Sequence, residues 1–391
     1  MQDIPPLPQS LPLSGIRVVE LGGNISGPYG TWILGQLGAT VSKIERPEGD
    51  DARGWGPPFW EDTATVFQAI NSNKASVAID LKDEAQVARL RDYIATEADV
   101  VLQNMRPGSV AKLGLDAERL CAANPRLIYC NLWAYGRTGP LSQRPGYDAL
   151  MQAFGGVMSI TGEEGRPPVR AGISAIDMGT GMWCAIGILA ALNRRHQSGR
   201  GGIVDASLFE TAVAWTSFYN LDAQVIGEDP AKHGSGVRGI TPYQGYECAD
   251  GYLIVAASND RLFVKLADML GHPEWCQDPR FADNASRSRN KPALNAILEP
   301  IFRVETREHW RAMLDEAGVP NAPIQVPREV VAHPQTQALG ILQKTGHLLE
   351  DGRNVALAGL PLSFDGERPP LRSVSPTLGS GSLTGDDTTD S

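Results

Sequence analysis

Asp148 is the side chain whose position in this sequence best suits covalent chemistry. It ends the segment 145–148, Pro-Gly-Tyr-Asp, directly before the helical run 149–154. Aspartate is a preferred N-cap residue, so closing this helix is an ordinary structural explanation for the carboxylate. A helix N-terminus also keeps a carboxylate ionised, and an ionised carboxylate on a short side chain can attack an activated carbonyl. Both interpretations stay open on the residues alone.

Several cationic side chains lie where a parallel sheet would bind an anion. Arg46, Lys82, Arg106 and Lys112 each lie at or just after the end of a predicted strand. Taken singly, each is an ordinary surface charge. Ligands bind beyond the carboxyl ends of the strands in open parallel sheets, so the four together predict a pocket for an anionic ligand. A formal net charge of −10 does not exclude such a local pocket.

Other catalytic signatures are missing from the sequence. The six histidines are scattered and none pair at ligand spacing, so we expect no metal. The sequence contains no GxSxG elbow and no P-loop, and residues 22–27, Gly-Gly-Asn-Ile-Ser-Gly, do not form a GxGxxG fingerprint. These observations argue against a serine hydrolase, a nucleotide hydrolase and a nicotinamide-dependent enzyme.

Composition favours a cytoplasmic protein. The five cysteines form no CxxC pair and their number is odd, which fits reduced thiols better than disulfides. The acidic net charge argues against nucleic acid as a partner. The start of the chain lacks the pattern of a signal peptide, and the longest apolar stretch, 182–192, is too short to span a bilayer. We therefore expect neither nucleic acid nor a membrane as partner.

The elements that must position these residues follow a β-α-β pattern. Residues 16–21 and 40–45 read as strands, with a helix over 29–37 between them. The pattern continues with strands at 76–80, 100–102 and 127–132, and with helices at 83–98 and 116–123. It predicts an α/β fold with an open, mostly parallel sheet and helices on both faces.

The second half of the chain no longer follows the β-α-β pattern. Residues 175–193 predict a buried helix, and 203–222 predict a short strand followed by one long helix. Asp250-Gly251 is a hairpin signal, and charged amphipathic helices follow it. We expect an N-terminal arm at 1–12, a discontinuous large domain at 13–220 and 325–372, a smaller α+β domain inserted at 221–324, and a disordered tail at 373–391.

Short motifs spread over residues 13–370 point together to one family. They include 13–21 (Leu-Ser-Gly-Ile-Arg-Val-Val-Glu-Leu), 43–47 (Lys-Ile-Glu-Arg-Pro), 104–108 (Asn-Met-Arg-Pro-Gly), 135–140 (Tyr-Gly-Arg-Thr-Gly-Pro) and 146–148 (Gly-Tyr-Asp). In these motifs the chain resembles the family III CoA-transferases of the CaiB/BaiF type. That family includes formyl-CoA, carnitine and dicarboxylate CoA-transferases.

The resemblance implies a fold and a mechanism. The fold would be a Rossmann-like large domain with an inserted small domain, in an interlocked homodimer. Asp148 matches the family's nucleophile, which forms an acyl anhydride and then an aspartyl-CoA thioester. No cofactor would be tightly bound, because coenzyme A and its thioesters are substrates. The matched CoA contacts are Gly23, Asn24, Ile25, Ser26, Arg46, Ile79, Asp80, Leu81, Lys82, Asn104, Met105, Arg106, Lys112, Trp133, Ala134, Tyr135 and Gly136.

Within this family the substrate and even the reaction have alternatives. Residues 50–59 resemble dicarboxylate-handling members, which favours succinate, glutarate or mesaconate, with Arg170 or Arg238 as the cation for the distal carboxylate. His233-Gly-Ser-Gly236 replaces the four glycines of formyl-CoA transferases, which argues against oxalate and formate. The alternatives are a 2-methylacyl-CoA racemase, disfavoured by Tyr147 where racemases have histidine, and a non-catalytic acyl-CoA-binding paralogue.

Overall fold

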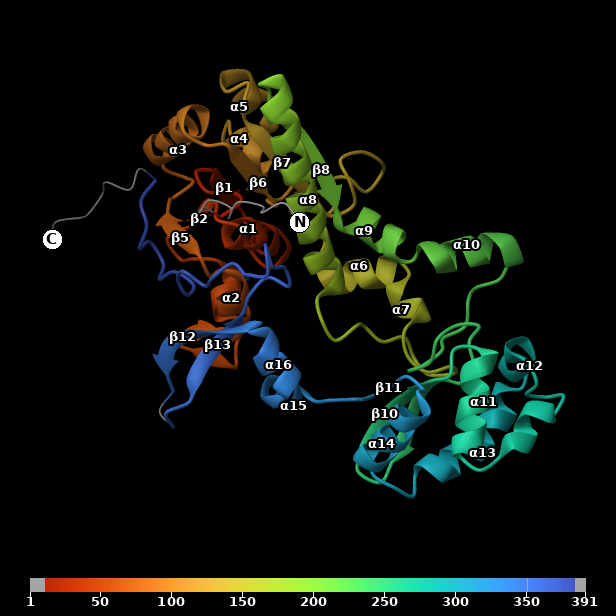
Figure 1. The fold of residues 1–391 in the computed structure, drawn as a ribbon. Coiled ribbons are helices and arrows are strands. Elements are labelled where there is room, and N and C mark those ends of the chain that lie inside the picture. Colours follow the sequence, from red (N-terminus) through yellow and green to blue (C-terminus); the bar gives the residue numbers. More distant parts are fainter. Residues whose placement is uncertain (1–10, 350, 384–391) are drawn as a thin grey trace, which may run out of the picture. The chain divides into compact units, whose positions relative to one another are not determined.

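The computed structural model describes residues 11–349 and 351–383. They form two compact units (Figure 1): the first contains the chain up to Val157, Ala171–Leu221 and the part from Pro334 onward, and the second contains Met158–Arg170 and Asp222–His333. The expected N-terminal arm lies, up to residue 10, outside the described residues.

The unit boundaries differ from the expected domain boundaries in two places. Residues 158–170 belong to the second unit, where the Gly234 amide donates to the Gly162 carbonyl oxygen at 3.0 Å. Residues 325–333 also belong there, because Arg307 forms an ion pair with Glu329 at 3.0 Å. Such contacts between distant parts of the chain leave no periodic signal in the sequence.

A six-stranded, wholly parallel sheet forms the centre of the first unit, as expected from the β-α-β pattern. Its strand order is β5-β2-β1-β6-β7-β8. The chain starts at the central strand β1, so the sheet has a topological switch point between β1 and β6. The strands are β1 (Arg17–Leu21), β2 (Thr40–Glu45), β5 (Lys74–Ala78), β6 (Val100–Gln103), β7 (Ile128–Trp133) and β8 (Gly202–Ser207).

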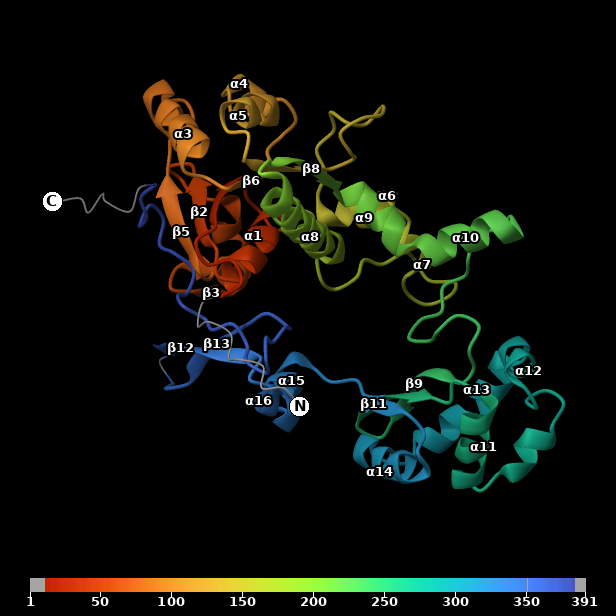
Figure 2. The same ribbon diagram turned by 45° about the horizontal axis from the view of Figure 1, so that its top comes forward.

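Helices cover both faces of this sheet (Figures 1 and 2). On one face, α1 (Ser26–Gln36) and α8 (Ala175–Ser198) share a core with Val18. On the other face, α3 (Glu84–Thr96), α4 (Ser109–Lys112) and α5 (Ala117–Ala123) share a core with Val19. Neighbouring strand residues therefore point to opposite, fully buried layers, which explains the continuous apolar runs in the sequence.

Two helices differ from the expected ones. The single long helix expected before 222 is divided at Thr216 into α9 (Leu208–Trp215) and α10 (Ser217–Ile226), and the Thr216 hydroxyl bonds back to the Ala212 carbonyl oxygen at 2.9 Å. Helix α8 has 24 residues and extends beyond the apolar stretch that was expected to be too short for a bilayer. By length and composition it could cross a membrane, and 50% of its most apolar window is buried in the structure.

The other elements of the first unit are short. They are the 3₁₀ helix η1 (Asp51–Gly54), β3 (Phe59–Trp60), β4 (Thr63–Ala64), α2 (Thr65–Ile70), α6 (Asp148–Phe154), α16 (Pro334–Leu339) and the antiparallel pair β12 (Leu342–Leu348) and β13 (Asn354–Ala358). Helix α7 (Val157–Ile160) begins at the boundary with the second unit.

The second unit is α+β, as expected. Strands β9 (Tyr243–Cys248) and β10 (Gly251–Ala256) form the hairpin signalled by Asp250-Gly251, and β11 (Asn321–Pro323) pairs with β10. Their apolar face packs on a separate hydrophobic core. The helical elements are α11 (Asp260–Met269), η2 (Pro273–Gln277), α12 (Asn284–Arg289), α13 (Lys291–Phe302), α14 (Arg307–Ala317) and α15 (Pro327–Ala332).

The disorder predicted for the tail is wrong for residues 373–383. This segment lies beside the edge strand β5: the Asn73 amide donates to the Ser373 carbonyl oxygen at 3.1 Å, and the Gly381 amide donates to the Ser76 carbonyl oxygen at 2.8 Å. The segment therefore covers an otherwise open sheet edge, and backbone hydrogen bonds to this edge hold it in place although its composition is polar. Residues 384–391 lie outside the described residues.

Candidate active site

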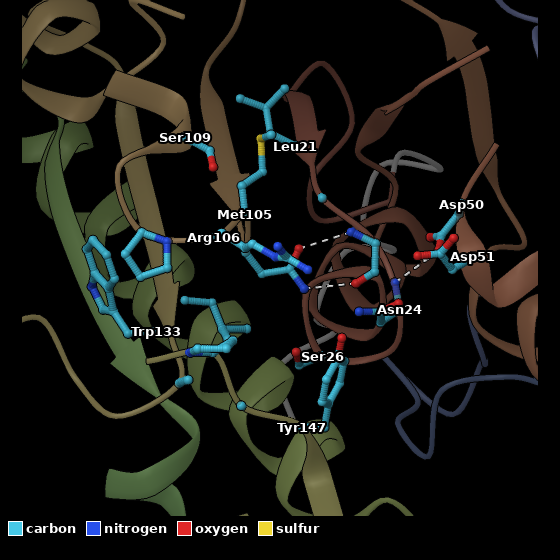
Figure 3. Close-up of a pocket in the computed structure, with 18 of the residues that line it drawn as sticks. Leu21, Asn24, Ser26, Asp50, Asp51, Met105, Arg106, Ser109, Trp133 and Tyr147 are labelled. Carbon is cyan, nitrogen blue, oxygen red and sulfur yellow. Dashed lines mark hydrogen bonds between the residues drawn. The ribbon is translucent and has the colours of Figure 1, made fainter. Parts of the chain in front are cut away.

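A cavity of about 450 Å³ lies at the carboxyl ends of the parallel strands (Figure 3). The segments that follow β1, β2, β6 and β7 line it, together with Leu81 after β5 and Leu208 at the start of α9. This position includes the switch point between β1 and β6, where open α/β sheets bind their ligands.

The structure brings ten of the seventeen expected CoA-contact residues to this cavity: Gly23, Asn24, Ser26, Arg46, Leu81, Asn104, Met105, Arg106, Trp133 and Ala134. The other seven lie nearby in the chain but do not line it. Ile79 is buried in the core, and Asp80 accepts a hydrogen bond from the Lys82 amide in a turn. Tyr135 packs on Phe154 and Phe209. The remaining ones are Ile25, Lys82, Lys112 and Gly136.

The loop Gly22–Ser26 forms one side of the cavity and is held from two directions. The Asn104 side chain accepts from the Gly23 amide at 3.1 Å and donates to the Gly23 carbonyl oxygen at 2.8 Å. The Asp50 carboxylate accepts from the Asn24 amide at 3.1 Å. Gly22 has φ +145°, and a Cβ there would lie 1.7 Å from the Asn104 side-chain oxygen, so this position requires glycine.

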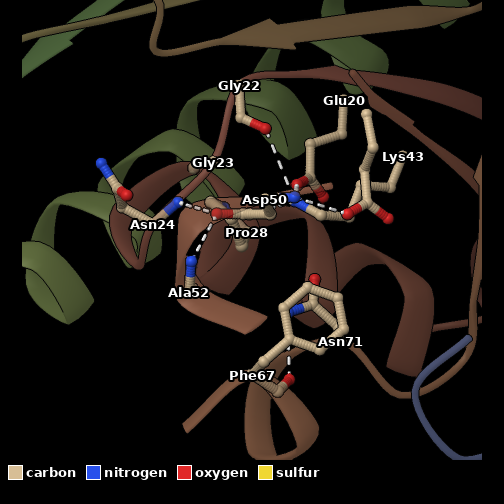
Figure 4. Close-up of polar contacts among 12 residues, drawn as sticks. Glu20, Gly22, Gly23, Asn24, Pro28, Lys43, Asp50, Ala52, Phe67 and Asn71 are labelled. Carbon is tan, nitrogen blue, oxygen red and sulfur yellow. Dashed lines mark hydrogen bonds and ion pairs between the residues drawn. The ribbon is translucent and has the colours of Figure 1, made fainter. Parts of the chain in front are cut away.

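A buried ion cluster stands behind this loop (Figure 4). Lys43 contacts Glu20 at 2.6 Å and Asp50 at 2.7 Å, and Lys74 contacts the other Glu20 oxygen at 2.8 Å. The side chains of all four are at most 1% exposed. Burial alone would raise the pKa of Glu20, but the two lysines lower it to about 2. The cluster thus joins β1, β2 and β5 to the loop that lines the cavity.

Cationic groups lie on the cavity wall, as an anionic ligand requires. Arg46, Arg106 and Arg144 all line it, and Arg106 points into it in Figure 3. Arg46 also donates to the Gly49 carbonyl oxygen at 2.9 Å and forms an ion pair with Asp51. Guanidinium groups are well suited to phosphate oxygens. Arg144 was missed in the sequence because it lies in a loop far from any strand end.

Asp148 does not cap its own helix, contrary to one interpretation of the sequence. The N-cap of α6 is Tyr147, and Asp148 is the first helical residue. The Asp148 Oδ1 atom instead accepts from the backbone amides of Ile176 at 2.9 Å and Asp177 at 3.1 Å, in the first turn of α8. Its side chain is therefore fixed by a second, much longer helix, and it is 6% exposed.

Gln152 is a second partner of Asp148 that was not selected from the sequence. Its side-chain NH₂ donates to Asp148 Oδ2 at 2.5 Å, and its side-chain oxygen accepts from the Ala171 amide at 2.8 Å. The Ala171 contact fixes which end of the amide faces the carboxylate. Gln152 lies one helical turn after Asp148 on α6, so an i,i+4 pair of polar residues in an apolar helix was the available signal.

Asp177 links Asp148 to the cavity. It lines the cavity, it is 8% exposed, and its side chain is hydrogen-bonded by Ser26. Burial, followed by the negative charge of Asp148, raises the pKa of Asp177 to about 7, although the Ser26 hydrogen bond opposes this rise. Asp148 itself lies beside the cavity, next to Tyr147 and Asp177, which both line it.

Two arginines suggested for a distal substrate carboxylate belong to the second unit. Arg170 ends its first segment, and Arg238 forms an ion pair with Asp222. No group of three or more histidine, cysteine, aspartate or glutamate side chains suited to a metal ion occurs in the described part of the chain.

Known proteins resemble this chain over nearly its whole length. A family model for CoA-transferase family III matches residues 13–382. A human succinyl-CoA:glutarate CoA-transferase is 36% identical over 86% of this chain and 77% of its own, and an acetyl-CoA:oxalate CoA-transferase of Acetobacter aceti is 36% identical over 92% of both. The crystal structure of a CAIB/BAIF family protein from Brucella suis is 38% identical, with a TM-score of 0.85 over 95% of this chain and 97% of its own. The chain therefore belongs to the CoA-transferase family III and is a CoA-transferase.

Proposed function

We propose that this enzyme moves coenzyme A from an acyl-CoA to a small dicarboxylate through covalent intermediates on Asp148. The observation that supports this best is the setting of the Asp148 carboxylate. It is buried, three N–H groups from α6 and α8 hold it, and it lies beside a cavity with arginines on its wall.

In the proposed reaction, Asp148 attacks the donor thioester and forms a mixed anhydride with release of CoA thiolate. The thiolate then attacks the Asp148 carbonyl carbon, which gives an aspartyl-CoA thioester and the free donor acid. The acceptor carboxylate reverses these steps. Each step exchanges one activated acyl group for another of similar energy, so no ATP is needed, but water must be excluded.

The two backbone amides of α8 give this mechanism an oxyanion site on the enzyme's own carboxyl group. When the thiolate adds to the Asp148 carbonyl carbon, negative charge develops on a former carboxylate oxygen. The Oδ1 position already accepts from Ile176 and Asp177, at the positive end of a 24-residue helix. The amides of Gly23 and Asn24 in the Gly22–Ser26 loop already donate to Asn104 and Asp50, so they do not take part in this oxyanion site.

The acceptor class rests on the relatives. Those named for transfer to glutarate, in human and in Agrobacterium fabrum, are each 36% identical to this chain, and so is the one named for oxalate. All of these named acceptors are dicarboxylates. We therefore infer a dicarboxylate acceptor and infer succinyl-CoA as a donor.

A carboxylate panel tests this assignment. With succinyl-CoA as donor, we expect glutarate or mesaconate to give kcat/KM at least tenfold above butyrate, because a distal carboxylate adds a charge-assisted contact of about 1.5–3 kcal/mol. Double-reciprocal plots should give the parallel lines of ping-pong kinetics. Equal rates with butyrate would contradict the dicarboxylate assignment, and α-deuterium exchange without acyl transfer would show a racemase instead.

We also propose that the enzyme is a homodimer and that it works in the cytoplasm. Large apolar side chains of the first unit are exposed, including Trp183, Ile186, Trp215, Phe218 and Leu221 at 45–72%. A second copy that covers them would remove apolar surface from water. All five cysteines are free, which fits a reducing compartment. Light scattering is expected to give twice the 42.0 kDa chain mass, and a monomeric mass at micromolar concentration would contradict the dimer.

A further inference from the structure

Asp177 is a buried carboxyl group that the mechanism above does not use. It is the third residue of α8, where its backbone amide donates to Asp148 Oδ1 at 3.1 Å. Its side chain lines the cavity and is hydrogen-bonded by Ser26, the first residue of α1. Gly181 permits this arrangement, because a Cβ there would lie 2.6 Å from the Ser26 carbonyl oxygen and would force α1 and α8 apart.

The surroundings of the two carboxyl groups are unequal. Asp148 accepts hydrogen bonds from three N–H donors, those of Ile176, Asp177 and Gln152. Among the described residues, the groups that act on the Asp177 carboxyl are Asp148 on α6 and the Ser26 hydroxyl on α1, and neither is a cation. Burial, followed by the negative charge of Asp148, raises the pKa of Asp177 to about 7, so Asp177 is the carboxyl group of this site that is placed to hold a proton near neutral pH.

We propose that Asp177 is the general acid and base that gives a proton to the sulfur of coenzyme A when Asp148 is acylated and takes it back when the sulfur returns. This inference rests on the proposed role of Asp148 as nucleophile. It assigns the second carboxyl group of the site to the leaving thiol, whereas Asp148 acts on the carbonyl carbon.

The steps balance in atoms and charge. In the first, the Asp148 carboxylate bonds to the thioester carbonyl carbon, the C–S bond breaks, and the Asp177 proton moves to sulfur. The products are the anhydride, neutral CoA thiol and an Asp177 carboxylate. In the second, the Asp177 carboxylate removes the thiol proton as sulfur bonds to the Asp148 carbonyl carbon, and the donor acid leaves as its carboxylate. One negative charge is present among the reacting groups before and after each step.

The unchanged total charge gives a physical reason for placing two carboxyl groups, Asp148 and Asp177, in one site. Acylation removes the charge of Asp148 and with it the main electrostatic opposition to an ionised Asp177. Without proton transfer, a thiolate would have to be held in a largely buried site beside the Gly22–Ser26 loop, at a desolvation cost. The carboxyl pair replaces that thiolate by a carboxylate already seated next to a hydroxyl donor.

Asp177 could also have a purely structural role. An acidic side chain in the first turn of a helix interacts favourably with the helix dipole, and this stabilises the fold by about 0.3–1 kcal/mol. Asp177→Asn separates the two roles, because asparagine keeps the shape and the neutral form but cannot transfer a proton. Asp116→Asn is the matched control: Asp116 accepts from the Arg119 amide at the start of α5 and does not line the cavity.

We expect Asp177→Asn to lower kcat about 100-fold or more with KM changed less than threefold, since positioned acid–base groups contribute about 10²–10⁴-fold. Asp116→Asn should match wild type. The acid must start protonated, so wild-type kcat/KM should fall as the pH rises through about 7, and this fall should be missing in Asp177→Asn. A variant kcat within threefold of wild type, or a flat wild-type profile from pH 6 to 9, would overturn the proposal.

A wild-type measurement keeps the proposal testable if the variant does not fold. A solvent deuterium isotope effect on kcat of about 2 or more is expected for proton transfer to or from sulfur in the transition state, and no isotope effect would overturn the proposal. Hydroxylamine trapping of wild type distinguishes this failure from failure of the proposed function. A labelled Asp148 with an unaffected Asp177→Asn rate would refute only the role of Asp177, whereas an unlabelled Asp148 would refute the nucleophile.

Discussion

Replacement of Asp148 by alanine is expected to lower the rate of CoA exchange by at least 10⁴-fold. Loss of a covalent nucleophile removes the whole two-step route, and comparable losses in other enzymes reach about 10⁴–10⁶ in kcat. The measurement is transfer of CoA from succinyl-CoA to labelled glutarate, followed to long times. Binding of CoA should persist, because the arginines and the Gly22–Ser26 loop of the cavity are unchanged.

The structure provides a control for indirect effects of this substitution. Alanine also removes the acceptor for two amides of α8, which costs about 0.5–2 kcal/mol of stability. Asp116→Ala removes a similar acceptor from α5 and should cost about the same stability while keeping full activity. If Asp148→Ala kept more than about 1% of the wild-type rate, direct chemistry by this carboxylate would be refuted.

Replacement of Glu20 by leucine is expected to destabilise the protein by about 3–5 kcal/mol, because removing one partner of a buried ion pair leaves the other charge unpaired. Glu20 is the shared partner of Lys43 and Lys74, and all three side chains are at most 1% exposed. Urea unfolding followed by circular dichroism measures the change. The cavity wall should also shift, because Lys43 forms an ion pair with Asp50, and Asp50 accepts a hydrogen bond from the Asn24 amide in that wall.

The ion pair of Arg17 and Glu97 is the matched comparison. Arg17 is on the same strand as Glu20, but both side chains of this pair are about half exposed. Arg17→Ala should change the unfolding free energy by less than about 1 kcal/mol. Equal effects of the two substitutions would show that the buried cluster does not depend on Glu20 for stability.

The sheet and the position of the cavity could be predicted because both depend on local patterns. Strands β1, β6 and β7 contain consecutive apolar residues, and polar segments follow them. The parallel order then brings Asn24, Arg46, Asn104 and Arg106 together, although they are far apart in the chain. Lys82 and Lys112 also follow strands, but their segments turn away into α3 and α4.

The surroundings of the nucleophile could not be predicted in the same way. Gln152 and Asp177 approach Asp148 because α6 meets the first turn of α8, and no local pattern encodes which helix end a carboxylate will cap. Asp148 does accept hydrogen bonds from the first turn of a helix, as an N-cap residue would, but the helix is α8 and not its own helix α6. The ordered segment 373–383 was missed for a similar reason: its partners Asn73 and Ser76 lie some 300 residues away.

Chemical trapping of Asp148 during turnover shows whether this carboxylate carries the acyl group in covalent form. Wild-type enzyme incubated with succinyl-CoA and then treated with hydroxylamine, which captures acyl anhydrides and thioesters, is digested and analysed by mass spectrometry. A hydroxamate is expected on the peptide that contains Asp148, formed only when acyl-CoA is present, and none is expected in Asp148→Asn. A fully active enzyme whose Asp148 is never labelled, with either hydroxylamine or borohydride, would contradict a covalent role of this carboxylate.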